Sequence, residues 1–428
     1  MNRTGLLTSL TAILILLGLV NHARNFLILS IPLLVFLSAA LLFYPMKIQL
    51  NITRTLSTDH VEENSPVKIM ILVENTGPKL ELVQFNQVLY SPLEKVDGKL
   101  SQLTMLRPGD KTEIQFSVRA KRGIYILPYT ICTAREHFDL LQNHHVDKTS
   151  DHFLSLPTFS RFRHIPIRPE QTRGFPGPIP ARKGGSGIDF FGVREYQIGD
   201  PLRWVNWRHT ARHVEGLFSN EFEQEHIADV GLILDARLQN NIYNAKDDLF
   251  EHAVRMTASI AEAFLAEGNR VGLLIYGLGI ERTFPGYGKI QQNRILRALA
   301  RAKPGHNFSL ETLNYLPVRL FPPHSQIVFI SPLSALDIQP LIRLRAKGYE
   351  VMLISPDPID FETKGIKPQS NLELATRLAR VERNLWIQKL QRAGVKVLEW
   401  RVDEPITAWL RTTMNRRSLR YHHLRLSV

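Results

Sequence analysis

Two apolar, uncharged runs open the chain and constrain its fold more than any other feature. They cover residues 5–20 and 26–44, and the polar segment 21–25 separates them. A helix of about 17 to 25 residues crosses the ~30 Å hydrocarbon core of a bilayer. We therefore expect a transmembrane helical hairpin over residues 1–46. A cleaved signal peptide over residues 1–20 is the alternative, but no small-x-small cleavage site follows it and the second run begins at once.

The distribution of basic residues predicts the orientation of this hairpin. Arg3, Lys47 and Arg54 flank its outer ends, whereas only Arg24 lies in its connection. Basic residues near membrane spans prefer the cytoplasmic side. We expect a cell-membrane protein with two spans, whose termini and remaining domains are cytoplasmic.

Residues 47–158 show short alternating runs that are typical of β-strands. The runs 67–73 and 113–118 alternate in polarity, and turn clusters at 75–78 and 107–110 adjoin them. Strands of this length at regular spacing predict a small antiparallel β-sandwich domain.

From residue 229 to the C-terminus the pattern alternates between buried strands and amphipathic helices. This rhythm predicts a doubly wound α/β sheet covered on both faces. Strands are expected at 230–234, 271–276, 327–330, 351–354 and 395–400, and helices at 250–267, 290–302, 372–392 and 406–416.

The intervening segment, residues 159–228, combines a connector with a dense motif. Its first part, 159–183, is rich in proline and basic residues, which favours an extended connector. Its motif, 184–213, contains no Cys, no pair of His at metal-ligand spacing, no nucleophile elbow and no phosphate-binding loop. We therefore expect no catalytic residues, no cofactor and no metal, and a protein that is not an enzyme.

The motif combines glycines, aromatic residues and charged residues at close spacing: Gly187, Phe190, Arg194-Glu195-Tyr196, Gly199-Asp200, Arg203, Asn206-Trp207 and Ala211-Arg212. This pattern resembles the signature of the prokaryotic domain-of-unknown-function-58 family. The resemblance implies an immunoglobulin-like sandwich, whose Arg-Gly-x-Tyr-x-Leu element matches residues 122–127, and a von Willebrand factor A-like α/β domain. It also implies a MoxR-type AAA+ ATPase as partner.

The A-like resemblance implies a metal site at the end of the first strand, normally Asp-x-Ser-x-Ser. Asp235 is present, but Arg237 and Gln239 stand at the serine positions, and Pro332 follows Ser331 where a ligand Asp is expected. Because a guanidinium repels a cation at close range, we expect this site to be degenerate. Asp235 would then pair with Arg237 or with an arginine of the motif.

The motif allows two roles for its polar residues. In one, they form a docking face, because Arg and Trp are frequent interface anchors. In the other, Tyr196, Trp204 and Trp207 pack the segment while its charges satisfy one another. We expect Arg194 and Arg203 to be structural and Arg212 to be exposed. The candidate partner-binding residues are Arg194, Glu195, Asp200, Arg203, Asn206, Trp207 and Arg212.

These patterns predict a membrane-anchored protein–protein interaction scaffold. The alternative is a membrane-surface hydrolase that uses Asp200 or Glu195 with His209. The net charge of +13 could indicate nucleic-acid binding, but the cations are dispersed along the chain. Attraction to anionic lipid headgroups explains this charge better, and nucleic acid is an unlikely partner.

Overall fold

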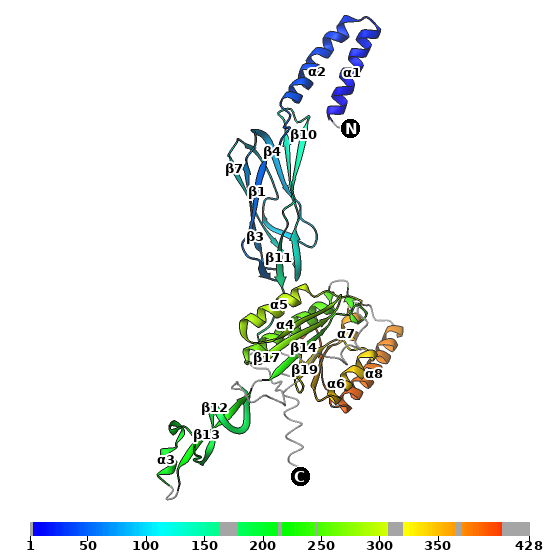
Figure 1. The fold of residues 1–428 in the computed structure, drawn as a ribbon. Coiled ribbons are helices and arrows are strands. Elements are labelled where there is room, and N and C mark those ends of the chain that lie inside the picture. The colour runs from blue at the N-terminus through cyan, green and yellow to red at the C-terminus, as the bar shows by residue number, and fades with distance from the viewer. Residues whose placement is uncertain are drawn as a thin grey trace. The chain divides into compact units, whose positions relative to one another are not determined.

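The computed structural model describes residues 3–161, 179–212, 216–226, 228–244, 247–306, 320–364, 366 and 370–404. The chain divides into two compact units, Met1–Leu156 and Pro157–Val428 (Figure 1). Most of the predicted connector and the whole predicted helix 406–416 lie outside the described residues.

The N-terminal helices are α1 (Arg3–Val20) and α2 (Arg24–Leu42), which form an antiparallel hairpin. The chain turns through His22, which has a positive φ of 52°. The helices approach closely at Gly18, where an added Cβ would lie 2.7 Å from the side chain of Leu27. Their mean hydropathies are 1.9 and 2.3. Both helices are therefore long and apolar enough to span a membrane, as the sequence predicted.

The rest of the first unit consists of β-strands. The sheet orders are β1-β3-β7-β5, β10-β9-β4-β6 and β2-β11-β8. The strands are β1 (Leu50–Leu56), β2 (His60–Glu62), β3 (Val67–Asn75), β4 (Leu80–Gln87), β5 (Glu94–Gly98), β6 (Ser101–Leu106), β7 (Lys111–Arg119), β8 (Gly123–Leu127), β9 (Thr130–Arg135), β10 (Gln142–Asp147) and β11 (Asp151–Leu156).

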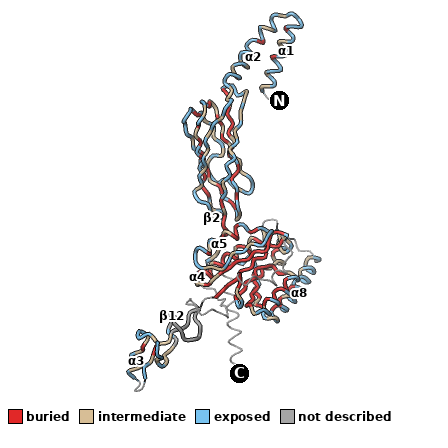
Figure 2. Tube along the Cα trace, viewed as in Figure 1, coloured by how far each residue is buried: buried red, intermediate tan, exposed pale blue. Residues whose placement is uncertain are grey.

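Alternating burial along these strands creates one core. Ile69 and Ile71 of β3 and Phe116 of β7 are buried, and they share a cluster with Phe85 of β4 and Cys132 of β9. Figure 2 shows the buried residues along these strands in red. Each such side chain contributes about 1.5–3 kcal/mol on burial. The two four-stranded sheets thus pack against each other, and the predicted all-β region is confirmed.

The second unit contains a six-stranded sheet of order β18-β17-β14-β19-β20-β21, in which β18 alone runs antiparallel to its neighbour. The predicted α/β region is confirmed. The strands are β14 (Asp229–Asp235), β17 (Arg270–Tyr276), β18 (Ile280–Gly286), β19 (Gln326–Ile330), β20 (Glu350–Pro356) and β21 (Lys396–Trp400); the helices are α4 (Leu249–Ala266), α5 (Gly288–Arg301), α6 (Ile338–Ala346), α7 (Pro358–Thr363) and α8 (Ser370–Arg392).

Helices cover both faces of this sheet. Leu341 of α6 and Leu390 of α8 share a core cluster with Ile233, Phe329 and Leu353, which lie on one face of the central strands. α4 packs on β14 and β17, and α5 packs on β17 and β18. Sequence periodicity missed β18, α6 and α7. β18 alternates between exposed and half-buried residues at the sheet edge and therefore lacks the apolar run of a central strand.

Residues 179–212 and 216–226, which include most of the motif, form an arm. β12 (Ile179–Glu195) and β13 (Phe218–His226) pair in antiparallel fashion with register shifts. Residues 179–183, the last part of the predicted extended connector, belong to β12. Between these strands lie a 3-10 turn, Leu202–Trp204, and the short helix α3 (Trp207–Thr210). We call the described residues 196–212 and 216–217 the arm tip.

Candidate functional site

A buried ion pair between Arg237 and Asp235 lies at the carboxyl end of the central strand β14. Arg237 donates from Nε to Oδ1 of Asp235 and from Nη2 to its Oδ2, both at 2.7 Å. The side chains are 2% and 1% exposed. This is the bidentate geometry in which arginine binds carboxylates most strongly. Of the two partners that the sequence allowed for Asp235, the structure has Arg237.

Three further residues complete this cluster, which we call the β14 cluster. Nη2 of Arg237 also donates to Oδ1 of Asp337, at 2.7 Å. Ser331 and Asn240 donate to Oδ2 of Asp235 at 2.7 and 2.6 Å. Sequence reasoning missed Asp337, although its spacing from Ser334 is that of a capping box, which the structure contains.

Burial and charge act in opposite directions on these groups. Burial disfavours the charge of Arg237, but the hydrogen bonds and charges of Asp235 and Asp337 outweigh it, so the pKa of Arg237 lies above its ordinary value. Burial raises the pKa of Asp337, and the charge of Arg237 only partly opposes this effect. One guanidinium thus pairs with two carboxylates and can offset only one of their two negative charges.

The remaining residues of the expected metal site do not converge on Asp235. Gln239 is exposed, and the carbonyl of Pro332 accepts a 2.6 Å hydrogen bond from Arg383. Within the described ranges, no group of three or more His, Cys, Asp or Glu side chains could hold a metal. The guanidinium of Arg237 supplies the positive charge beside Asp235.

The arm has its own, more exposed ion pair. Nη2 of Arg194 donates to Oδ1 of Asp200 at 2.7 Å, and Oδ2 of Asp200 accepts from the backbone N–H of Gln197 at 3.0 Å. The side chains of Arg194 and Asp200 are 31% and 11% exposed. The hydrogen bond from Arg194 holds the pKa of Asp200 below its ordinary value. Arg194 is thus paired within the arm, and the structural role expected for it stays a prediction.

Asn206 organises the arm tip as a helix cap. Its Oδ1 accepts from the backbone N–H of His209 at 2.9 Å, and its Nδ2 donates to Oδ1 of Asn220 on β13 at 2.7 Å. The backbone N–H of Asn206 also donates to the carbonyl of Phe218. This residue therefore joins α3 to the ribbon and has a structural role.

Other residues of the motif face solvent. Trp207 is 65% exposed, so the packing role considered for it is wrong, whereas Trp204 is half-buried. Arg203 lies in the 3-10 turn and is exposed, which disfavours the internal role expected for it. Glu195 and Arg212 are exposed too. The arm tip adds three exposed apolar residues, Ile198, Leu202 and Leu217.

Two of the three residues of the hydrolase alternative, Asp200 and His209, are engaged in structural contacts, whereas Glu195 is exposed. Both carboxylate oxygens of Asp200 accept hydrogen bonds, and the ring of His209 packs edge-on against Phe218 with centroids 4.8 Å apart. A carboxylate whose pKa is lowered in this way is a weak base.

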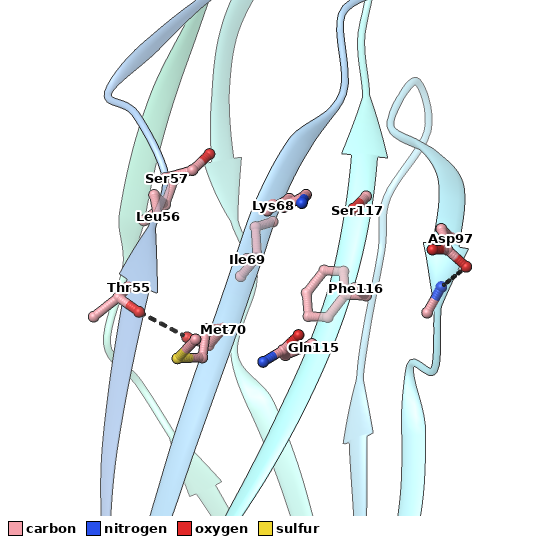
Figure 3. A pocket seen from close by; sticks show the side chains of 11 residues that line it. Thr55, Leu56, Ser57, Lys68, Ile69, Met70, Asp97, Gln115, Phe116 and Ser117 are labelled. Atoms are coloured by element: carbon pink, nitrogen blue, oxygen red, sulfur yellow. Dashed lines mark hydrogen bonds between the residues drawn. The ribbon is translucent and has the colours of Figure 1, made fainter.

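A surface hollow of about 560 Å³ lies on the β1-β3-β7-β5 sheet (Figure 3). Lys68 and Asp97 are its charged lining residues, and the backbone N–H of Gly98 donates to Oδ1 of Asp97.

One protein-family model is similar to part of the chain. The model of "Protein of unknown function DUF58" matches residues 192–360, which is less than half of the chain but includes the arm tip and the β14 cluster. The Uncharacterized protein YeaD of Bacillus subtilis (strain 168) is 30% identical over 121 residues. This alignment covers 28% of each chain, so it spans far less than two thirds of that relative.

Solved structures resemble only part of the chain. A FixG-related protein from Vibrio parahaemolyticus is 9% identical, with a TM-score of 0.18, over 25% of this chain and 95% of its own. The CARDB domain of a Pyrococcus furiosus protein, in complex with di-metal ions, is 15% identical, with a TM-score of 0.19, over 26% of this chain and 92% of its own. Scores this low assign neither a fold nor a ligand.

Proposed function

We propose that this protein is a membrane-anchored protein–protein interaction scaffold whose partner is a MoxR-type AAA+ ATPase. The arm tip carries the proposal. Its frame is satisfied internally through Arg194, Asp200 and Asn206, while Trp207 and Arg203 project into solvent. Trp and Arg are the side chains that most often anchor protein interfaces. A rigid frame also lowers the entropic cost of binding.

We further propose that the sandwich is immunoglobulin-like and that the α/β unit is von Willebrand A-like. The order of its sheet, with β14 central, and the acidic residue at the end of β14 support the second assignment. In such a domain, Arg237 would replace the bound cation. Partner binding would then not use a metal-bridged carboxylate, and surfaces such as the arm tip would carry recognition.

We propose that α1 and α2 span the membrane with both termini and both units on the cytoplasmic side. The basic flanks and the apolar lengths of these helices support this orientation. Protease added to intact cells is expected to leave the chain whole, whereas permeabilised cells lose it. Cleavage near Trp400 in intact cells would contradict the orientation.

The scaffold proposal has more support than the hydrolase alternative. Asp200 is committed to Arg194 and to the backbone of Gln197, and a general base must be able to accept a proton from a substrate group. We therefore propose a protein that is not an enzyme and that contacts a lipid bilayer and a protein partner rather than nucleic acid.

Binding of the ATPase to arm-tip variants tests the proposal. Trp207→Ala, Arg203→Ala and Arg212→Ala remove exposed side chains. Each should raise the Kd for the ATPase by about 30-fold or more, since interface anchors contribute at least ~2 kcal/mol. Leu278→Ala is a matched control, because Leu278 is 77% exposed outside the arm. Unchanged binding by all three arm variants, with the fold intact, would overturn the proposal.

A further inference from the structure

One face of α8 presents an apolar stripe to solvent. Its members are Leu374, Leu378, Val381 and Leu385, which are 70%, 69%, 57% and 60% exposed. The opposite face is buried, since Ile387 and Leu390 pack into the core of the α/β unit. A soluble surface rarely leaves several large apolar side chains contiguous unless they are covered by a partner.

The spacing of this α8 stripe is that of a coiled-coil seam. Its residues follow one another at intervals of four, three and four, which places them at alternating a and d positions of a heptad. An ordinary amphipathic surface helix would direct such a stripe to its own core. Here the core-facing stripe is a different one, so α8 has two apolar faces.

The charges beside the stripe are complementary to those of an identical helix. Arg377 and Glu382 are exposed and five residues apart, with Arg377 at a g position and Glu382 at an e position. In a parallel pair of helices, residue g of one helix lies beside residue e of the next heptad on the other, so two Arg–Glu contacts form. In an antiparallel pair, like charges would face each other.

We propose that α8 pairs in parallel with α8 of a second copy of this chain, which makes the protein a homodimer. The helix is already fixed on the domain, because Arg383 donates to the carbonyl of Pro332 at 2.6 Å and to Oγ of Ser355 at 2.8 Å. Pairing therefore does not have to supply the free energy of forming the helix. For a short isolated coiled coil, this cost of helix formation limits the stability of the dimer. This proposal does not depend on the ATPase as partner.

Hydrophobic disruption is the first test. The full chain in detergent is expected to dimerise with increasing concentration in analytical ultracentrifugation. Leu378→Glu should raise the dimer dissociation constant at least roughly a hundredfold, because both copies lose a buried leucine. Leu336→Glu is the control, since Leu336 is equally exposed, at 69%, but lies outside the stripe. It should dimerise like the unaltered chain.

Charge reversal then distinguishes self-pairing from another occupant. Arg377→Glu and Glu382→Arg should each weaken the dimer, and the double variant should restore it. A dimer that the double variant fails to restore would overturn the parallel arrangement. A chain that stays monomeric at all concentrations, or in which Leu378→Glu lowers only the unfolding midpoint, would show that the stripe is not a dimer contact.

A cysteine cross-link reports the orientation directly. Leu374→Cys lies at one end of the stripe, so it meets its own copy only in a parallel pair, and mild oxidation should produce a covalent dimer. The natural Cys132 does not compete, because it is buried and burial raises its pKa to about 12. The opposite result would be that Leu374→Cys fails to cross-link, while a mixture of the Leu378→Cys and Val381→Cys variants forms a covalent heterodimer. This result would contradict the parallel arrangement.

Discussion

The β14 cluster and the arm each depend on an Arg–Asp hydrogen bond of 2.7 Å, yet they differ in exposure. Arg237 and Asp235 are almost fully buried, whereas 31% of the Arg194 side chain is exposed. In water a salt bridge contributes little, because solvent competes for both charges. In the interior, the same pair cannot lose one member without leaving a charge unpaired. Equal geometry therefore does not mean equal importance for stability.

This contrast separates a structural region from a region that is available to partners. The β14 cluster uses all of its charges within the domain. The arm uses Arg194 and Asp200 for its frame and leaves Arg203, Arg212 and Trp207 exposed.

Removal of the buried cation should have the largest effect. Arg237→Met leaves Asp235 and Asp337 without a counter-charge, and we expect the free energy of unfolding of the α/β unit to fall by about 3–5 kcal/mol. Hydrogen exchange at the amides of β14 measures this loss. Arg237→Lys is the control, because it keeps the charge but loses the bidentate geometry, and its loss should be smaller. If the β14 amides exchange equally slowly in Arg237→Met and in the unaltered chain, the buried ion pair is no more important for stability than the exposed pair of the arm.

Removal of the cap in the arm should have an intermediate effect that stays local. Asn206→Ala removes the acceptor for His209 N–H, and loss of a helix cap typically costs ~1 kcal/mol. Amides of the arm tip should then exchange roughly fivefold faster. Amides of β14 serve as the internal control and should not change. Faster exchange in both regions would show that the arm and the α/β unit unfold together.

The sequence predicted those elements whose periodicity is strong. Helices α1, α2 and α4 and the central strands of the α/β sheet were identified because they are long apolar or amphipathic runs. The edge strand β18 and the short helices α6 and α7 depend on tertiary contacts, which periodicity does not contain.

The candidate site was predictable only in part. Asp235 and Arg237 are two residues apart, so their pairing could be inferred locally. Asp337 lies 100 residues beyond Arg237 in the sequence, and only the adjacency of β14 and β19 brings it near. The exposure of Arg203 was missed because the motif was treated as a packed joint, whereas it forms a ribbon with a separate tip.

Loss of the exposed ion pair should have a smaller effect than loss of the cap. Arg194→Ala removes the donor that lowers the pKa of Asp200. A carboxylate whose pKa is lower in the folded state than in the unfolded state stabilises the fold at pH values above its unfolded-state pKa. This stabilisation disappears as the pH falls through the folded-state pKa. The order of the arm tip should therefore weaken only below about pH 4. The amide signal of Gln197 in NMR follows this change, and Arg194→Ala should shift its midpoint upward. An identical midpoint in both chains would exclude this role of Arg194.

Addition of divalent cations should have no effect on the β14 cluster. A magnesium site with a Kd of ~10 μM would contribute ~2.7 kcal/mol at a roughly hundredfold excess of ion. Arg237 already donates to both oxygens of Asp235, and a cation would have to displace this guanidinium from a buried site. Millimolar Mg²⁺ or Mn²⁺ should therefore leave the melting temperature unchanged. The variant Arg237→Ser, Gln239→Ser restores the Asp-x-Ser-x-Ser pattern and provides the comparison. A rise in the melting temperature of the unaltered chain that Asp235→Ala abolishes would show that Asp235 binds an ion in spite of Arg237.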